Sequence, residues 1–540
     1  MASVIGKKVN GRTYYYLAES ARVDGRPRIV SQRYLGSADD IAAAVAGAAG
    51  APEHSRHLAF GDVAAVWSTL ERLSVARIAD EVAGGRGGQL PIGACLAVAV
   101  LHRLTGATME IADWWPTTAA ARFVRPKPPA GGWTAPRLWR RLDKLSVPEM
   151  ERIEAELAAV VRKIAGGGAA LAVDVPGFAT FVASAEAMAI GTRATTLVGL
   201  GLVVTGDGAI PLVSRAYRRD VPVVASFGAM AEQLSARHRR LAGRDVTLVF
   251  DTGQHSQLNL STGPHFVGAL PPADFPELLS RPATARRAVD ARRFPGVTAL
   301  DTRAAVFGVN RRVILTHSTN LHAAQARGLA QALSTATRQL DGLAAGLAAG
   351  TYRQSRDELL TELARITRVP RVDRVLTTRI SADMRLEWRI DEAARARLDQ
   401  EIFGKQLLVT DHDDWPVADV VTAYRARYHL DSTFRQLNEP FVTGPPAARW
   451  YWTDHRIAVF SLTNVIAATV AHVMRREADR AGLDLSVREL LEQLSGIQET
   501  LLRYPSTGGR PRTRRVLTDR DGRQQQLFDL FGLSAYAPKA

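Results

Sequence analysis

The spacing of apolar and polar residues divides the chain into a β-rich opening, a helical block and a long mixed region. Residues 13–17 and 28–35 are rich in tyrosine, isoleucine and valine, and they are joined through Asp24-Gly25, a favoured turn pair. This pattern predicts a small basic β-hairpin within residues 1–45. Residues 58–165 repeat their apolar positions with the period of an α-helix, which predicts a helical block.

Short apolar runs after the glycines of residues 166–168 predict strands and place the protein in the α/β class. The first runs, in the segment 169–256, are residues 170–175, 197–205, 210–214 and 246–250. The next segment, 257–415, looks like an insertion domain that alternates strands with long helices. Its expected strands are 266–268, 312–316, 386–390 and 406–410, and its expected helices are 321–349 and 356–367. We expect helices over 416–503 and a basic, turn-rich tail over 504–540.

The composition is that of a core-forming globular protein. Of the 540 residues, 46% are hydrophobic and 23% are charged, so disorder is not expected. The single cysteine, Cys95, excludes a disulfide framework. The apolar stretch 457–474 is interrupted by serine, threonine, asparagine and histidine, which favours a buried core helix over a membrane span. We expect a cytoplasmic protein without a membrane partner.

The charge balance has two explanations: a polyanionic partner, or a genome composition that makes both Ala and Arg abundant. The chain has 69 Lys and Arg against 54 Asp and Glu, a net charge of +15 and a pI near 10.3. Such an excess favours association with nucleic acid through counterion release. The N-terminal hairpin, the helical block and the tail could each contact DNA. Packing of the tyrosines on a neighbouring domain, and a solvated charge run in the tail, explain these features equally well.

Two acids stand at the ends of apolar strands. Asp174 ends the run Leu171-Ala172-Val173, and Asp251 follows Leu248-Val249-Phe250. Functional groups of α/β sheets concentrate at strand ends, where a rigid backbone presents the side chain to a cleft. An Asx-turn or a helix N-cap is the structural alternative, and the turn applies particularly to Asp251, which is followed by Thr-Gly.

A polar stripe follows one face of the helix expected after residue 417. Tyr424, Arg427, Asp431 and Asn438 are spaced so that a period of 3.6 residues places them on the same side. Arg427 and Asp431 could also form nothing more than a surface ion pair between residues four apart.

Three acids from distant segments suit phosphodiester cleavage. The reaction needs a nucleophilic oxygen, a stabilised leaving oxygen and neutralisation of the phosphoryl charge. Two Mg²⁺ ions held by carboxylates supply all three, and Mg²⁺ prefers oxygen ligands. Another acidic segment, Asp411-His412-Asp413-Asp414, looks like a metal cluster. A strand end followed by a helix N-cap explains that segment more simply, so we leave it out of the site.

The ordered motifs resemble those of bacterial DDE insertion-sequence transposases of the IS-four type, over nearly the whole chain. Residues 172–175 resemble the first-acid strand, and 246–259 resemble the second-acid motif, which 265–272 continue. The most specific likeness is the helix signature Tyr, two residues, Arg, three residues, Glu, six residues, Lys. It reads here as Tyr424, Arg427, Asp431 and Asn438.

The resemblance implies an RNase H-like catalytic domain with an insertion between the second and third acids. It implies that Asp174, Asp251 and Asp431 hold two Mg²⁺ or Mn²⁺ ions, and that Tyr424, Arg427 and Asn438 contact DNA. The implied partners are double-stranded DNA, as terminal inverted repeats and target, and a second copy of the chain in the synaptic complex. The expected localisation is the nucleoid within the cytoplasm.

The chain departs from the family pattern at three places. Asp431 stands where the family has Glu, Asn438 replaces its Lys, and Pro176-Gly177 follow the first acid. Aspartate keeps the charge and the oxygen ligands, whereas asparagine removes a phosphate contact. Two other classes therefore remain open: a catalytically silent DNA-binding regulator descended from a transposase, and a metal-dependent nuclease without strand transfer.

Overall fold

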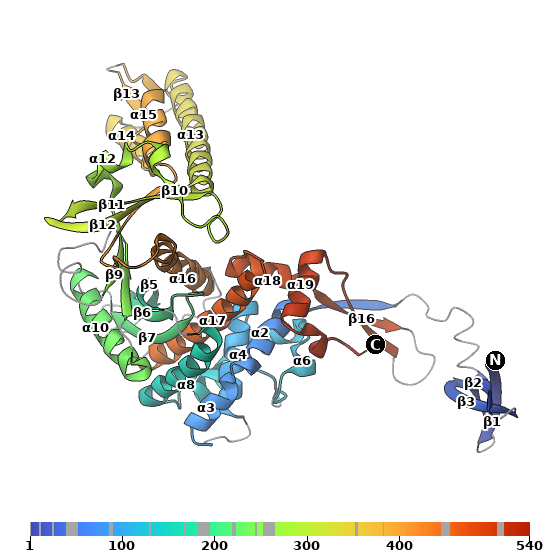
Figure 1. Cartoon of the computed structure of the whole chain (residues 1–540). Helices are drawn as coiled ribbons and strands as arrows, with labels where there is room; N and C mark the ends of the chain where they lie inside the picture. Colours follow the sequence, from blue (N-terminus) through green and yellow to red (C-terminus); the bar gives the residue numbers. More distant parts are fainter. Residues whose placement is uncertain are drawn as a thin grey trace, which may run out of the picture. The chain divides into compact units, whose positions relative to one another are not determined.

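A computed structural model gives the fold (Figure 1). The structure describes residues 2–9, 12–23, 26–38, 52–85, 90–128, 131–166, 169–181, 195–218, 223–243, 246–251, 265–351, 355–381, 383–443, 454–504 and 512–539. The chain forms two compact units built from interleaved segments. The first unit contains Met1–Ser68, Ile111–Trp133 and Glu489–Ala540, and the second contains Thr69–Glu110 and Thr134–Arg488.

The first unit opens with a three-stranded antiparallel sheet. The expected hairpin is confirmed as β2 (Arg12–Val23) paired with β3 (Arg26–Ser37), although its turn lies outside the described residues. The sequence did not predict the third strand, β1 (Ala2–Val9), which pairs with β2. The Tyr16 and Tyr34 rings pack edge to face at 5.3 Å.

A second small sheet in this unit has the order β17-β16-β4. The prediction of helix up to residue 503 is wrong at its end, because Gln498–Tyr504 forms strand β16. Part of the expected basic tail forms strand β17 (Arg512–Leu517) and helix α19 (Gly522–Leu530). The fully buried Glu499 of β16 forms ion pairs with both Arg122 and Arg515. The positive charges of these two arginines are therefore neutralised within the unit.

The expected helical block is confirmed in its main helices. They are α2 (Gly61–Arg72), α3 (Val75–Val82), α4 (Ile92–Thr105), α7 (Ala135–Leu142) and α8 (Val147–Ala165). The helix α17 (Asp454–Arg480) is long and apolar enough to cross a membrane, but 94% of its apolar window is buried within the protein. It has the burial of a core helix, as the sequence predicted.

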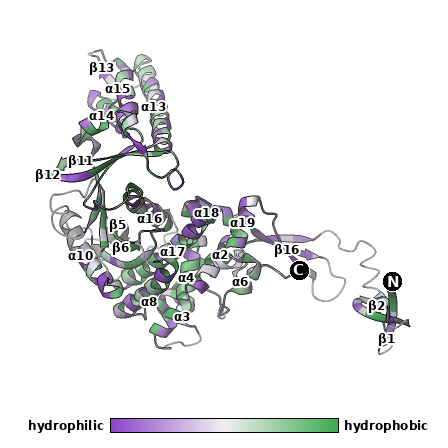
Figure 2. Ribbon diagram, viewed as in Figure 1, coloured by the Kyte–Doolittle hydropathy of each residue, from purple (hydrophilic) through white to green (hydrophobic). Residues whose placement is uncertain are grey.

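A nine-stranded mixed sheet forms the core of the second unit, and the α/β class is confirmed. Its order is β10-β11-β12-β15-β9-β8-β5-β6-β7. The expected strands are present as β5 (Ala170–Phe181), β6 (Thr195–Thr205), β7 (Pro211–Arg218), β8 (Val246–Phe250), β9 (Phe266–Leu270), β12 (Val309–Ser318) and β15 (Lys405–Thr410). The sheet also contains β10 (Arg287–Ala288) and β11 (Val297–Val306). Figure 2 shows β6 in the colour of hydrophobic residues, in keeping with its buried leucines and valines.

Residues 257–415, the expected insertion, thus contribute several strands to this sheet. Between β12 and β15 the same range also forms a body with its own hydrophobic cluster, which includes Leu340, Leu359 and Phe403. Its elements are α13 (Thr319–Ala348), α14 (Arg356–Thr367), β13 (Leu376–Ile380), β14 (Leu386–Ile390) and α15 (Glu392–Arg397). A capping box of Ser355 and Glu358 begins α14 where the sequence predicts it.

Candidate active site

The first two predicted acids lie at the same end of neighbouring parallel strands. β5 pairs in parallel with β8, with Val173 opposite Val249. Asp174 is the next residue of β5, and Asp251 follows β8 directly. The backbone therefore brings both acids to the carboxyl edge of the sheet. The side chain of Asp174 lies outside the part of the chain that the structure describes.

The predicted third acid comes from helix α16 (Val417–Thr443), which packs against β5, β8 and β9 (Figure 1). Val420, Leu430 and Phe434 of this helix are buried, at 0 to 1% exposure. Their spacing gives the helix an apolar face for the sheet. The buried face holds the polar stripe of the same helix at the strand ends.

Arg427 of α16 bridges two of the predicted acids. Its Nη1 lies 2.9 Å from Oδ2 of Asp251, and its Nη2 lies 3.6 Å from Oδ2 of Asp431. The Arg427 and Asp431 side chains are 17% and 11% exposed, and that of Asp251 is 38% exposed. The alternative of a surface ion pair is therefore wrong, because Arg427 and Asp431 are largely buried and Arg427 also contacts an acid from the sheet.

Tyr424 completes this cluster from the same helix. Its side chain is 3% exposed, and its hydroxyl donates a hydrogen bond to Oδ1 of Asp251 at 3.4 Å. Burial raises the pKa of the Tyr424 hydroxyl, and the neighbouring Tyr428 raises it further. The hydroxyl therefore stays protonated at neutral pH and acts as a hydrogen-bond donor to Asp251.

Two residues beside the cluster escaped the sequence analysis. The Tyr428 hydroxyl lies 3.4 Å from that of Tyr424 and accepts a hydrogen bond from Nε2 of Gln406 at 2.9 Å. The signal for Tyr428 was its position four residues after Tyr424 on the same helix. Gln406 has no such signal, because it belongs to the distant strand β15.

The charge on Arg427 is set by opposing effects. Burial lowers the pKa of its guanidinium, but the carboxylates of Asp431 and Asp251 raise it, and the net direction is upward. Arg427 is therefore a permanent cation between two acids. The Arg427 guanidinium thus places one positive charge beside the carboxylates of both Asp251 and Asp431.

The donor set of this cluster fits a hard divalent metal ion. Asp251 and Asp431 offer carboxylate oxygens that contact the two terminal nitrogens of one guanidinium. Mg²⁺ prefers such oxygen ligands and retains several waters. The last residue of the predicted set, Asn438, belongs to α16 two helical turns beyond Asp431, and its side chain lies outside the described residues.

Comparison with known proteins gives a likeness to solved structures alone. No protein-family model matches this chain, and no curated protein matches it. Among solved structures, it is similar to the cryo-EM structure of the piggyBac transposase synaptic complex with hairpin DNA. The identity is 10%, the match covers 80% of this chain and 78% of that chain, and the TM-score is 0.28. The function of this protein therefore has to be inferred from its own site.

Proposed function

We propose that this protein is a metal-dependent DDE-type DNA transposase of the bacterial IS-four type, which cuts the ends of a mobile element and joins them to a target. The observation that carries the proposal is the contact of Arg427 with both Asp251 and Asp431. These residues were selected from separate motifs of the sequence. Their meeting at the carboxyl edge of the sheet is what an acid-based phosphoryl-transfer site requires.

The arrangement of the sheet supports an RNase H-like core. Three neighbouring strands, β7, β6 and β5, pair antiparallel, and β5, β8 and β9 pair in parallel. Asp174 belongs to β5, Asp251 directly follows the adjacent strand β8, and Asp431 belongs to the later helix α16. Two acids on strands and one on a helix is the distribution that the resemblance implies.

In this proposal, Asp174, Asp251 and Asp431 hold two Mg²⁺ or Mn²⁺ ions. When bound, these ions lower the pKa of the attacking water and neutralise charge on the transferring phosphoryl group. Asp251 and Asp431 supply carboxylate oxygens, and Tyr424 fixes the Asp251 carboxylate through its hydroxyl. Arg427 moves from the acids to a DNA phosphate, where its planar guanidinium can donate two parallel hydrogen bonds.

Double-stranded DNA is the proposed partner, as inverted repeats and as target. The net charge of +15 supports binding to the phosphate backbone and a location on the nucleoid. Joining of two element ends in a synaptic complex calls for two copies of the chain, so we propose a DNA-bound homodimer. In this proposal Asn438, a neutral residue, contacts DNA where the family has a positively charged Lys.

A strand-joining assay tests this proposal against the two alternatives. Purified protein is incubated with Mg²⁺, a target plasmid and a labelled duplex that carries the inverted repeats flanking its gene. A transposase transfers the labelled 3′-end into the plasmid, and Asp251→Asn abolishes the transfer. Cut products that never join the plasmid would identify a nuclease. DNA binding that is equal in EDTA and Mg²⁺, without any cut product, would identify a regulator.

A further inference from the structure

Two histidines and an aspartate lie together at the amino end of β9, outside the candidate active site. The ligand atoms of His265, Asp411 and His412 all lie within 4.8 Å of one another. We propose that these three side chains form a second metal site, which binds a transition-metal cation such as Zn²⁺. The segment 411–414 was explained from the sequence as a strand end and helix cap, and His265 adds a ligand that the sequence did not connect with it.

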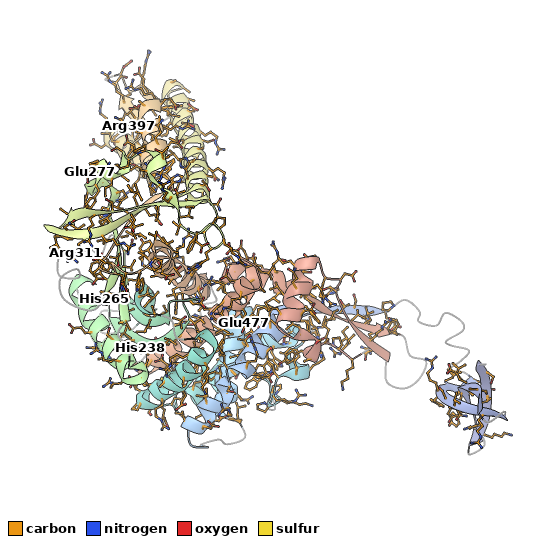
Figure 3. The ribbon with its side chains drawn as sticks, viewed as in Figure 1. His238, His265, Glu277, Arg311, Arg397 and Glu477 are labelled. Atoms are coloured by element: carbon orange, nitrogen blue, oxygen red, sulfur yellow. The ribbon has the colours of Figure 1, made fainter. Side chains whose placement is uncertain are left out.

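Pairing of strands from distant segments brings the three residues together. β15 runs antiparallel to β9 with Thr410 opposite Val267, so the end of β15 meets the start of β9. One carboxylate oxygen of Asp411 accepts a hydrogen bond from the backbone N–H of Phe266 at 2.8 Å. Asp411 therefore closes the start of β9, and its second oxygen faces His265 (labelled in Figure 3).

The separation of the first two ligands is close to that of a metal-bound pair. Nδ1 of His265 lies 3.1 Å from Oδ2 of Asp411. Bonds of about 2.0–2.1 Å in tetrahedral geometry place neighbouring ligand atoms roughly 3.3 Å apart. The hydrogen bond between these residues thus keeps two ligands at the spacing that a cation would use. The His265 side chain is 62% exposed and can tilt from its stack on the His412 ring.

The third ligand, His412, is already oriented by its surroundings. Its Nε2 is hydrogen bonded to Oγ1 of Thr247 at 2.8 Å, and its ring stacks on Trp415 at 3.8 Å. The backbone around it is fixed by Arg312, whose Nη1 donates to the carbonyl oxygens of His412 at 2.6 Å and of Trp415 at 2.8 Å. With Nε2 bonded to Thr247, Nδ1 is the ring nitrogen left for a metal. A hydrogen bond to the second nitrogen is the usual support for a histidine ligand.

The donor chemistry decides the class of cation. Two imidazoles and one carboxylate suit Zn²⁺, Cu²⁺ or Ni²⁺ better than Mg²⁺. Two cations beside the cluster are paired with acids outside it: Arg312 lies 2.7 Å from Asp301, and Arg303 lies 2.7 Å from Asp413. Their repulsion of a bound cation is correspondingly reduced.

This site is separate from the acids of the candidate active site. Thr247, which contacts His412, precedes Asp251 by four residues of β8, or about 13 Å along an extended strand. The two sites therefore lie at opposite ends of the same strand. A cation here would tie β9 to β15, and its presence does not depend on the proposed reaction.

Zinc binding by the full chain, without an affinity tag, tests the proposal. Metal-stripped protein is titrated with Zn²⁺ by calorimetry and with Co²⁺ by visible absorption. The variants are His265→Ala and, as a ligand replacement, His265→Cys. His54→Ala is the matched control, because His54 is an exposed histidine of β4 (His54–Ala59). Asp251→Asn separates this site from the acids.

We expect one Zn²⁺ equivalent at micromolar or tighter affinity, weakened at least tenfold by His265→Ala and largely retained by His265→Cys. His54→Ala and Asp251→Asn should leave it unchanged. Zn²⁺ should also raise the melting temperature of the wild type and not that of His265→Ala. A cooperative melting transition of His265→Ala without zinc shows that this variant is folded. Equal affinity of His265→Ala and wild type, no zinc binding by the wild type, or loss of binding in Asp251→Asn would each overturn the proposal.

Discussion

The guanidinium of Arg427 contacts the carboxylate of Asp251 at 2.9 Å, although the two residues belong to α16 and the end of β8. The same guanidinium reaches Asp431 one helical turn away. Arg427 is thus a cation that contacts both acids. Under the proposed function, divalent ions and Arg427 would compete for the same carboxylates. Removal of the Arg427 charge should therefore change both the free energy of unfolding and the affinity for metal.

Replacement of Arg427 by Gln should destabilise the protein in EDTA and make it responsive to metal. Asp431 would lose its ion pair with Arg427 in a largely buried position, which costs about 1–3 kcal/mol of the free energy of unfolding. Mg²⁺ should restore much of that loss, because it can neutralise both acids. Urea unfolding with EDTA and with Mg²⁺ measures the effect.

Arg77→Gln is the control for that experiment, since Arg77 pairs with Glu81 while both side chains are about 60% exposed. It should show little loss and no special response to Mg²⁺. If Arg427→Gln and Arg77→Gln behave alike, the bridge does not hold the two acids together.

Tyr424→Phe should reduce DNA cleavage while the fold persists. The change removes the hydroxyl 3.4 Å from Asp251 but keeps the buried ring. One hydrogen bond is worth about 0.5–1.5 kcal/mol, which corresponds to roughly a 2- to 10-fold lower rate. The exposed Tyr428 offers the matched variant Tyr428→Phe, for which a smaller change is expected. An effect of Tyr428→Phe larger than that of Tyr424→Phe would reverse the assigned order of importance.

Gly268→Ala should destabilise the edge of the sheet that carries Asp251. A Cβ atom on Gly268 of β9 would lie 2.1 Å from the ring of Phe250, the residue before Asp251. Overpacking of this kind costs about 1–3 kcal/mol. Gly328→Ala in α13 is the control: no described atom lies within 4 Å of the added Cβ, and the helix should gain about 0.5–1 kcal/mol. Thermal unfolding that ranks the two variants in the opposite order would contradict the packing of β8 on β9.

Local elements of this fold could be predicted from the sequence, and contacts between distant segments could not. The strand at 246–250 and the helix at 356–367 lie where the apolar pattern places them. Residues 498–504 form a strand and not the expected helix. The local pattern could not decide between the two, because the adjacent Leu501 and Leu502 fit either period. Strand pairing with β4 and β17 decides the outcome, and that pairing is not local.

The candidate site shows the same division. Helical spacing predicts that Tyr424, Arg427 and Asp431 share a face, and the structure places them together. Their contact with Asp251 depends on how α16 packs on the sheet, which no local pattern contains. Likewise, the sequence separates His265 from Asp411, and the pairing of β9 with β15 brings them within 3.1 Å.

Acid should destabilise the second unit through His472. This side chain is fully buried, its Nδ1 donates to the carbonyl of Gly208 at 2.9 Å, and its Nε2 accepts from Thr433 Oγ1 at 3.0 Å. Burial, followed by the charge of Arg475, lowers the pKa of His472 to about 3. In the unfolded chain the imidazole has its ordinary pKa of about 6.5.

Between these two pKa values the unfolded chain binds the proton more strongly than the folded chain. The contribution of His472 to the free energy of unfolding is therefore complete above about pH 6.5 and decreases as the pH is lowered below that value. From pH 6.5 to pH 5 the loss amounts to about 2 kcal/mol. Urea unfolding at pH 7.5 and pH 5.0, for wild type and His472→Gln, isolates this contribution. An identical pH dependence of both proteins would show that His472 is not held neutral by the fold.

The most direct test of the proposed function is metal-dependent nicking of a labelled duplex carrying the inverted repeats that flank the gene. Wild type, Asp251→Asn and Asp431→Glu are compared in Mg²⁺, Mn²⁺ and EDTA. The acid-based site predicts nicking by wild type with either metal, none in EDTA, and a loss of at least about 100-fold in Asp251→Asn. DNA binding without nicking by any of the three proteins, in any metal, would contradict it.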